Sequence, residues 1–196
     1  MFGRPVHSVL GLLFASLLAV LASTTLGCAP RWTVIQQAVP DPFLTQRQFV
    51  IEGIHTDRLI VGDLPEALYL SRKTPEQQAS WQADKQDMIT RYAEGLISDG
   101  DGLLFPTQPG PTTFIVRPVV DFVEPGFYAF VASRPTEVDM RVEILAPSGR
   151  LLDAISVRSV IGASMINAAS GTRMRQAAED LGRVTAQYLK TRAFPQ

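Results

Sequence analysis

The chain has 196 residues, enough for one domain and an attachment segment, and its 46% hydrophobic content is typical of globular proteins. The charges nearly cancel, with 18 Lys and Arg against 19 Asp and Glu, so we expect no nucleic-acid partner. The single cysteine excludes an internal disulfide and a thiol-metal cluster, and two histidines, His7 and His55, are too few for most imidazole sites. We therefore expect neither a metal nor a cofactor.

The first residues indicate a leader for export. Arg4 is the only charge before an uncharged run, SVLGLLFASLLAVLA, which extends from Ser8 to Ala22. A positive start followed by about 7–15 apolar residues and then small residues is typical of a secretory signal peptide.

The next residues, STTLGC, resemble the lipobox of bacterial lipoproteins. Gly27 occupies the small position before the cleavage point, and Cys28 supplies the thiol that accepts diacylglycerol, whereas Thr25 stands where the family most often has Leu. The resemblance implies a signal peptide over residues 1–27 and a membrane anchor at lipidated Cys28. Because Ala29 rather than Asp follows the cysteine, it also implies the inner leaflet of the outer membrane, facing the periplasm.

Three other interpretations of the leader remain open. Ser8 to Ala29 approaches the roughly 20 residues that span a bilayer, so it could stay as a permanent membrane helix. An ordinary signal peptidase could instead cut after Val20–Ala22 and release an exported protein with one free thiol. The cysteine could also be there by chance.

The segment after the cysteine predicts a tether and then a folded domain. Residues 28–48 contain three prolines and no sustained periodicity, so we assign them to a lipidated tether and residues 49–196 to one periplasmic domain. FVIEGIH, residues 49–55, favours a first strand with His55 at a solvent-facing end, and residues 59–61 are ambiguous. A short helix with Pro65 in its first turn follows.

Residues 74–98 predict the clearest helix. Thr74 suits the N-cap, Pro75 the first helical position and Gln77 the third, as in a capping box. Lys85 falls within the apolar stripe, and we expect its long side chain to reach solvent, with a buried ion pair as the alternative. SDGDG, residues 98–102, favours a helix-ending turn over a calcium loop. The apolar stripe consists of Trp81, Met88, Ile89, Tyr92 and Leu96.

The following segment predicts strands. Around residues 112–126, Phe114, Val116, Val120 and Phe122 share one parity and should face the core, while Pro118 places this strand at an edge or at a bulge. Residues 127–132 predict another strand. Residues 138–145 and 151–161 predict a hairpin joined by a turn with Gly149, in which Val138, Met140, Val142 and Ile144 point inward.

The last predicted helix spans residues 170–192, and its periodicity divides it into two faces. The apolar stripe contains Met174, Ala177, Ala178, Leu181, Val184, Tyr188 and Leu189. The polar residues Arg173, Gln176, Glu179, Asp180 and Arg183 should lie mostly outside it.

The order of elements predicts an α+β domain of two layers, with a mainly antiparallel sheet and helices packed on one face. Together with the lipobox, this order resembles small α/β periplasmic lipoproteins, including transport-auxiliary, secretion-associated and cell-wall-synthase-activator proteins. The sequence contains no nucleophile elbow, zinc-protease motif, P-loop or dinucleotide fingerprint.

These observations favour a non-catalytic accessory lipoprotein that binds another component of the bacterial envelope, either a protein or a lipid-transport machine. The alternative is an envelope hydrolase whose carboxylates converge only in the fold, which requires a pocket with two acids. A third possibility is self-assembly into a ring or pore, and the oligomeric state stays open.

Overall fold

The computed structural model describes residues 30–195, so the leader and the expected lipid acceptor Cys28 lie outside the described residues. The compact unit begins at Arg31. Its helices are η1 Pro42–Leu44, α2 Glu66–Ser71, α3 Pro75–Ser98 and α4 Ser170–Ala193. Its strands are β1 Trp32–Gln36, β2 Phe49–Ile51, β3 Ile60–Val61, β4 Leu64–Pro65, β5 Phe114–Glu124, β6 Phe127–Ala129, β7 Ala132–Arg134, β8 Thr136–Leu145 and β9 Leu151–Ile161.

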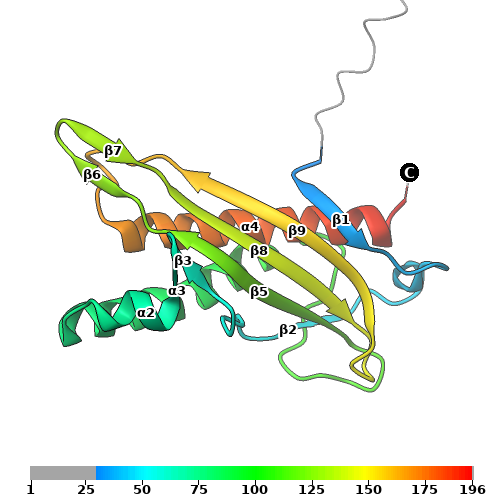
Figure 1. Ribbon diagram of the computed structural model, residues 1–196. Helices are drawn as coiled ribbons and strands as arrows, with labels where there is room; N and C mark the ends of the chain where they lie inside the picture. Colours follow the sequence, from blue (N-terminus) through cyan, green and yellow to red (C-terminus); the bar gives the residue numbers. More distant parts are fainter. Residues whose placement is uncertain (1–29, 196) are drawn as a thin grey trace, which may run out of the picture. The chain divides into compact units, whose positions relative to one another are not determined.

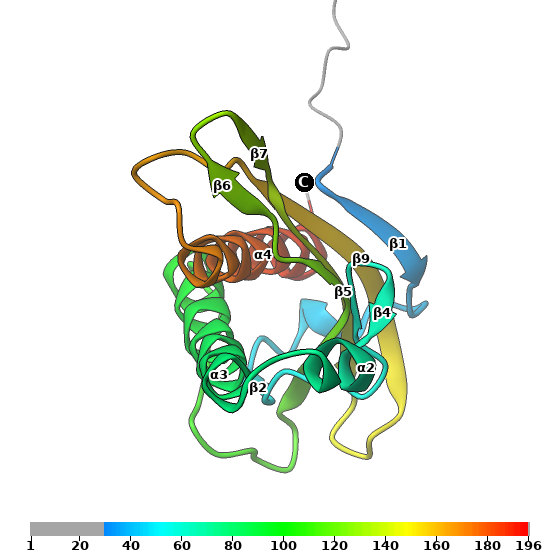
Figure 2. The same cartoon turned by 60° about the vertical axis from the view of Figure 1, so that its left-hand side comes forward.

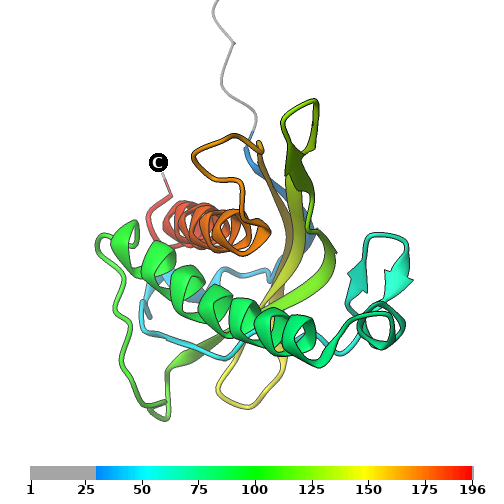
Figure 3. The same cartoon turned by 90° about the vertical axis from the view of Figure 1, so that its left-hand side faces the viewer.

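The predicted α+β architecture is confirmed. A seven-stranded sheet has the order β1-β9-β8-β5-β3-β4, with β2 also paired to β5. Most neighbours are antiparallel, whereas β2 and β3 run parallel to β5. The long helices α3 and α4 pack together on one face of the sheet (Figures 1 and 3), and the core lies between these two layers.

The predicted hairpin of β8 and β9 is confirmed. Val138, Met140, Val142 and Ile144 alternate inward and are fully buried against the helices. Gly149 adopts a φ of +81° in the connecting turn, and its N–H donates to the carbonyl of Ala146 at 2.8 Å. A residue with a side chain rarely adopts this φ, which is why glycine stands there.

β5 differs from the prediction in two ways. It is a central strand, because β8 pairs with one side and β2 and β3 with the other, so the edge position suggested by Pro118 is wrong. The bulge of the strand lies between Val120 and Phe122. Because a bulge adds one residue, the parity changes there, and Val123 rather than Phe122 is buried in the core.

The position of Pro118 coincides with a break in the pairing between β5 and the preceding segment. The N–H of Glu52 donates to the carbonyl of Val116 at 2.9 Å, and the next bond runs from the N–H of His55 to the carbonyl of Pro118, also at 2.9 Å. A regular parallel ladder would next use an N–H at position 118, which proline lacks. Residues 53–54 therefore leave the sheet.

The two long helices form where the sequence predicts them. Thr74 and Gln77 make the full capping box of α3. The helices approach closely at two glycines: an ideal Cβ on Gly95 would lie 2.1 Å from the carbonyl oxygen of Glu179, and one on Gly182 would lie 2.2 Å from that of Tyr92. The predicted apolar stripe of α4 is completely buried.

Arg173 contradicts the predicted faces of α4. It was expected outside the apolar stripe, but its side chain is fully buried at the start of the helix. Four oxygen atoms of neighbouring backbone and side-chain groups accept hydrogen bonds from its guanidinium, so the charge is solvated by the protein instead of by water. Periodicity alone cannot identify such a residue.

The segment expected to be a tether belongs to the fold from Arg31 onward. β1 pairs antiparallel with β9, placing Trp32 beside Val157, and Phe43 of η1 is fully buried. The expected strand over residues 49–55 is shorter, since β2 ends at Ile51. The expected strand over residues 127–132 is a hairpin of β6 and β7.

Candidate functional site

A cleft lies beside α3, where the segment that leaves the sheet passes between β5 and the helix. Its volume is about 190 Å³. Thr56, Gln82 and Gln86 bring polar groups to its rim, and Lys85 is half-buried in its wall. The remaining lining is apolar and consists of Ile54, Leu59, Trp81, Met88, Ile89, Val120, Val123 and Met174.

Lys85 forms the ion pair that was the alternative in the sequence analysis, and the expectation that it reaches solvent is wrong. Its Nζ lies 2.6 Å from Oε1 of Glu66, and both side chains are mostly buried. The indole N–H of Trp81 donates to the same oxygen, also at 2.6 Å. Glu66 of α2 therefore holds two residues of α3 and neutralises the charge beside the cleft.

The lining of this cleft favours binding over acid-base chemistry. Among the described residues that form it, none is Asp or Glu, so it lacks the paired acids that the hydrolase alternative requires. Its volume is also below the roughly 300–1,000 Å³ of most small-molecule pockets. The cleft has room for one apolar side chain of a partner, with amide groups at the rim to orient it.

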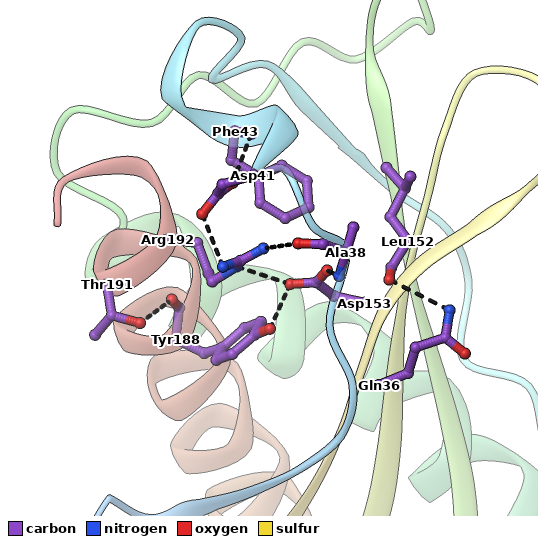
Figure 4. A network of polar contacts seen from close by, with 9 residues as sticks. All are labelled: Gln36, Ala38, Asp41, Phe43, Leu152, Asp153, Tyr188, Thr191 and Arg192. Carbon is purple, nitrogen blue, oxygen red and sulfur yellow. Dashed lines mark hydrogen bonds and ion pairs between the residues drawn. The ribbon is translucent and has the colours of Figure 1, made fainter.

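Two carboxylates do converge elsewhere, on Arg192 near the end of α4 (Figure 4). Arg192 Nε donates to Asp153 at 3.0 Å, and its Nη1 lies 2.8 Å from Asp41. Asp153 also accepts from the hydroxyl of Tyr188 and, at 2.8 Å, from the N–H of Ala38. These contacts join the segment after β1 to β9 and α4.

This network has a structural role, because it connects three parts of the fold. Asp153 is fully buried, and neither it nor Asp41 lines the cleft beside α3. Burial raises the pKa of Tyr188, and the hydrogen bond to Asp153 raises it further, so the phenol stays a donor at neutral pH. A shared cation already satisfies both carboxylates, which leaves neither available as a free base.

The face of the sheet opposite the helices carries arginines that are paired with acids. Arg117 Nε lies 2.6 Å from Glu52, and this hydrogen bond holds the pKa of the Glu52 carboxyl below its usual range. Arg158 lies 2.5 Å from Glu137. Pairs of this kind suit a solvated face and offer little free positive charge to an anionic ligand.

The residues singled out from the sequence are not brought together in one site. Cys28, predicted as the lipid acceptor, lies outside the described residues. His55 bridges to β5 and its side chain is partly exposed, 3.4 Å from Glu52. Over residues 30–195, no cluster of three or more His, Cys, Asp and Glu is placed to hold a metal ion, and no helix has the length and apolarity to cross a membrane.

Comparison with known proteins gives matches in structure alone. The chain matches no protein-family model and no curated protein. A PelC dodecamer from Paraburkholderia phytofirmans is 12% identical with a TM-score of 0.42, covering 78% of this chain and 96% of that chain. A minor lipoprotein from Acinetobacter baumannii is 11% identical with a TM-score of 0.41, covering 76% and 95%. A hypothetical protein from Chlamydia trachomatis is 9% identical with a TM-score of 0.42, covering 74% and 98%. Likeness at this level does not extend to function.

Proposed function

We propose that this chain is a lipid-anchored accessory protein of the bacterial cell envelope that binds another envelope component without catalysing a reaction. The observation that carries the binding role is the cleft beside α3, which combines an apolar lining with a polar rim and no carboxylate. A partner that inserts one apolar side chain gains burial there and meets amides at the rim that can orient its backbone.

The attachment rests on the leader and on Cys28. An export signal followed by a single cysteine, after Gly27, is the pattern of a lipoprotein anchor. Several acyl chains on one residue make attachment effectively stable, since each buried CH₂ contributes about 0.8 kcal/mol. With Ala29 after the cysteine, we place the protein at the inner leaflet of the outer membrane, facing the periplasm.

Metabolic labelling tests the anchor. Cells that express the full chain are grown with labelled palmitate, and we expect label on the wild-type protein and none on Cys28→Ala. Thr25→Leu, which brings the lipobox closer to the family pattern, is the matched control and should keep the label. Continued labelling of Cys28→Ala would contradict the assignment.

Photo-crosslinking in intact cells tests the cleft. A photoreactive residue is placed at Gln82 or Gln86 on the rim, and at Gln176 on the exposed face of α4 as the control. We expect the rim positions to give one reproducible crosslinked species that the control does not give. The same products from all three positions, or none from the rim, would exclude the cleft as the contact.

A further inference from the structure

Two short segments at one end of the fold expose large apolar side chains. The turn between β6 and β7 holds Phe130 and Val131, which are 91% and 92% exposed. The loop over residues 162–169, between β9 and α4, holds Met165 and Ile166, which are 73% and 99% exposed. We call these four residues the apolar platform. Exposed apolar side chains that are grouped at one end of a fold, in contrast to scattered ones, indicate a surface that contacts a partner or a membrane.

Arg173 ties the two segments of the platform together. Its Nη2 donates to the carbonyl of Pro125 at 3.1 Å, just before β6. Its Nη1 donates to the carbonyls of Asn167 and Ala168 at 2.8 and 2.6 Å, in the loop before α4. One buried guanidinium thus holds the base of the β6–β7 hairpin and the end of the loop next to each other.

The chain enters the fold on the same side of the unit as the platform. The start of β1, the β6–β7 turn and the loop before α4 all lie at the top in three views that turn about the vertical axis (Figures 1, 2 and 3). Arg31 is held there by hydrogen bonds to Asp180 of 2.9 and 2.5 Å. Cys28 precedes Arg31 by three residues, and three residues reach at most about 11 Å.

We propose that the apolar platform inserts into the surface of the lipid bilayer that holds the acylated Cys28. This inference rests on the proposed function, because the lipid anchor is what brings the membrane to this side of the unit. A reach of about 11 Å leaves little room for another protein domain between the membrane and the start of β1. Exposed aromatic and aliphatic side chains at the end of a rigid element bury well in the headgroup and acyl boundary.

The charges beside the apolar platform indicate which class of phospholipid it requires. Arg134, the last residue of β7, lies 3.1 Å from Glu124, so its charge is already paired. Insertion therefore depends on apolar burial, and zwitterionic phospholipids suffice without anionic headgroups. A platform that relied on basic residues would instead require anionic lipid.

The single cysteine allows a site-specific test on the full chain. Acylation consumes the thiol of Cys28, so Val131→Cys carries the only free thiol and accepts a fluorescent label. Ser148→Cys, in the exposed turn between β8 and β9 at the opposite end, is the matched control. Both acylated proteins are reconstituted in vesicles of phosphatidylcholine and phosphatidylethanolamine that contain a phospholipid with a nitroxide on its acyl chain.

We expect the nitroxide to quench the label at position 131 at least about threefold more than the label at position 148, because an inserted side chain reaches the acyl boundary. Equal quenching on vesicle-bound, acylated protein overturns the insertion and leaves the anchor intact. A blue-shifted but unquenched label at position 131 also overturns it, and indicates contact with a second copy. An unacylated Cys28, shown by mass spectrometry, overturns the proposed function and this inference together.

Discussion

Arg173 Nε donates to the hydroxyl of Thr136 across 2.8 Å, and neither residue has any exposed surface. Thr136 in turn donates to the carbonyl of Pro125 at 2.6 Å, which Arg173 also contacts. Burial lowers the pKa of the Arg173 guanidinium, yet an arginine stays charged at neutral pH. The start of α4 thus encloses a cation whose partners are neutral oxygens. Removing it takes a donor from the oxygens of Thr136, Asn167 and Ala168, while the carbonyl of Pro125 keeps its bond from Thr136.

Arg173→Met tests this arrangement. The substitution keeps much of the side-chain volume but removes every donor, and we expect the free energy of unfolding to fall by about 2–4 kcal/mol. Urea denaturation of the two proteins measures the difference. Arg183→Met, on the exposed face of the same helix, is the control and should change stability by about 0.5 kcal/mol or less. Equal losses in the two variants would show that Arg173 is not a structural centre.

Gly182→Ala should disrupt the contact between α3 and α4. Alanine favours a helix by about 1 kcal/mol over glycine, but its Cβ would lie 2.2 Å from the carbonyl oxygen of Tyr92. We expect the clash to dominate and stability to fall by about 2 kcal/mol or more. Gly162→Ala, where nothing lies within 4 Å of the added atom, should stay within about 1 kcal/mol. A thermal melt of each variant distinguishes these outcomes, and a more stable Gly182→Ala would contradict the packing.

The pair of Asp180 and Arg31 predicts a pH dependence. Burial raises the pKa of the Asp180 carboxyl, but hydrogen bonds from Arg31 and Ser159 outweigh it and hold the pKa below its ordinary value of 3.8. A lowered acid pKa contributes stability that is present above pH 4 and lost as the pH falls through the folded value. We expect Asp180→Asn to be less stable than wild type by about 1 kcal/mol at pH 7.

At pH 3 the difference between wild type and Asp180→Asn should be smaller, since the unfolded chain then binds a proton that the folded chain resists. Urea denaturation at both pH values makes the comparison. Asp57→Asn is a suitable control because that side chain is 90% exposed. A difference that is the same at pH 7 and pH 3 would contradict the role of the Asp180 charge.

Tyr188→Phe removes the hydroxyl that donates to buried Asp153. The carboxylate keeps its bonds to Arg192 and Ala38, so we expect a moderate loss of about 1–3 kcal/mol at pH 7. Because burial raises the pKa of Tyr188, wild type should also lose stability as the pH rises above about 10, where the unfolded phenol ionises. The variant should lose less stability over the same range, since only the contribution of buried Tyr92, whose pKa burial also raises, remains.

Chemical denaturation of Tyr188→Phe at pH 7 and pH 10.5 measures both effects, with Tyr128→Phe in the partly exposed β6 strand as the control. The control should match wild type at pH 7. If Tyr188→Phe were as stable as wild type at pH 7, the hydroxyl would contribute no stability through the network around Asp153.

Local patterns predicted the parts of this fold that depend on local physics. The capping residues Thr74 and Gln77 marked the start of α3, and alternation identified β8. The turn with Gly149 indicated that β9 follows, and all of these signals depend on neighbours in sequence. The sequence did not predict β1, because its partner, β9, lies more than a hundred residues away and the prolines on either side of it suggested a tether. A five-residue edge strand is defined by pairing more than by its own composition.

The candidate site was less accessible to prediction. The cleft forms only where α3, β5 and the segment between β2 and β3 lie close together. No local sequence pattern predicts that these distant segments are neighbours in space. Lys85 stood out as a charge within an apolar stripe, which was a usable signal, but its partner Glu66 could be identified only in the fold. The partners of Arg173 could not be predicted, because they belong to separate segments that only the fold brings together.

The missing N–H of Pro118 bears on the shape of the cleft. Any other residue at this position would give β5 an N–H that points toward the departing segment. A regular parallel ladder would pair this N–H with the carbonyl of Glu52. Residues 53–54 lie outside the sheet at this point, and Ile54 and Thr56 line the cleft. The proline in the middle of β5 thus coincides with the departure of the segment that forms one wall of the cleft.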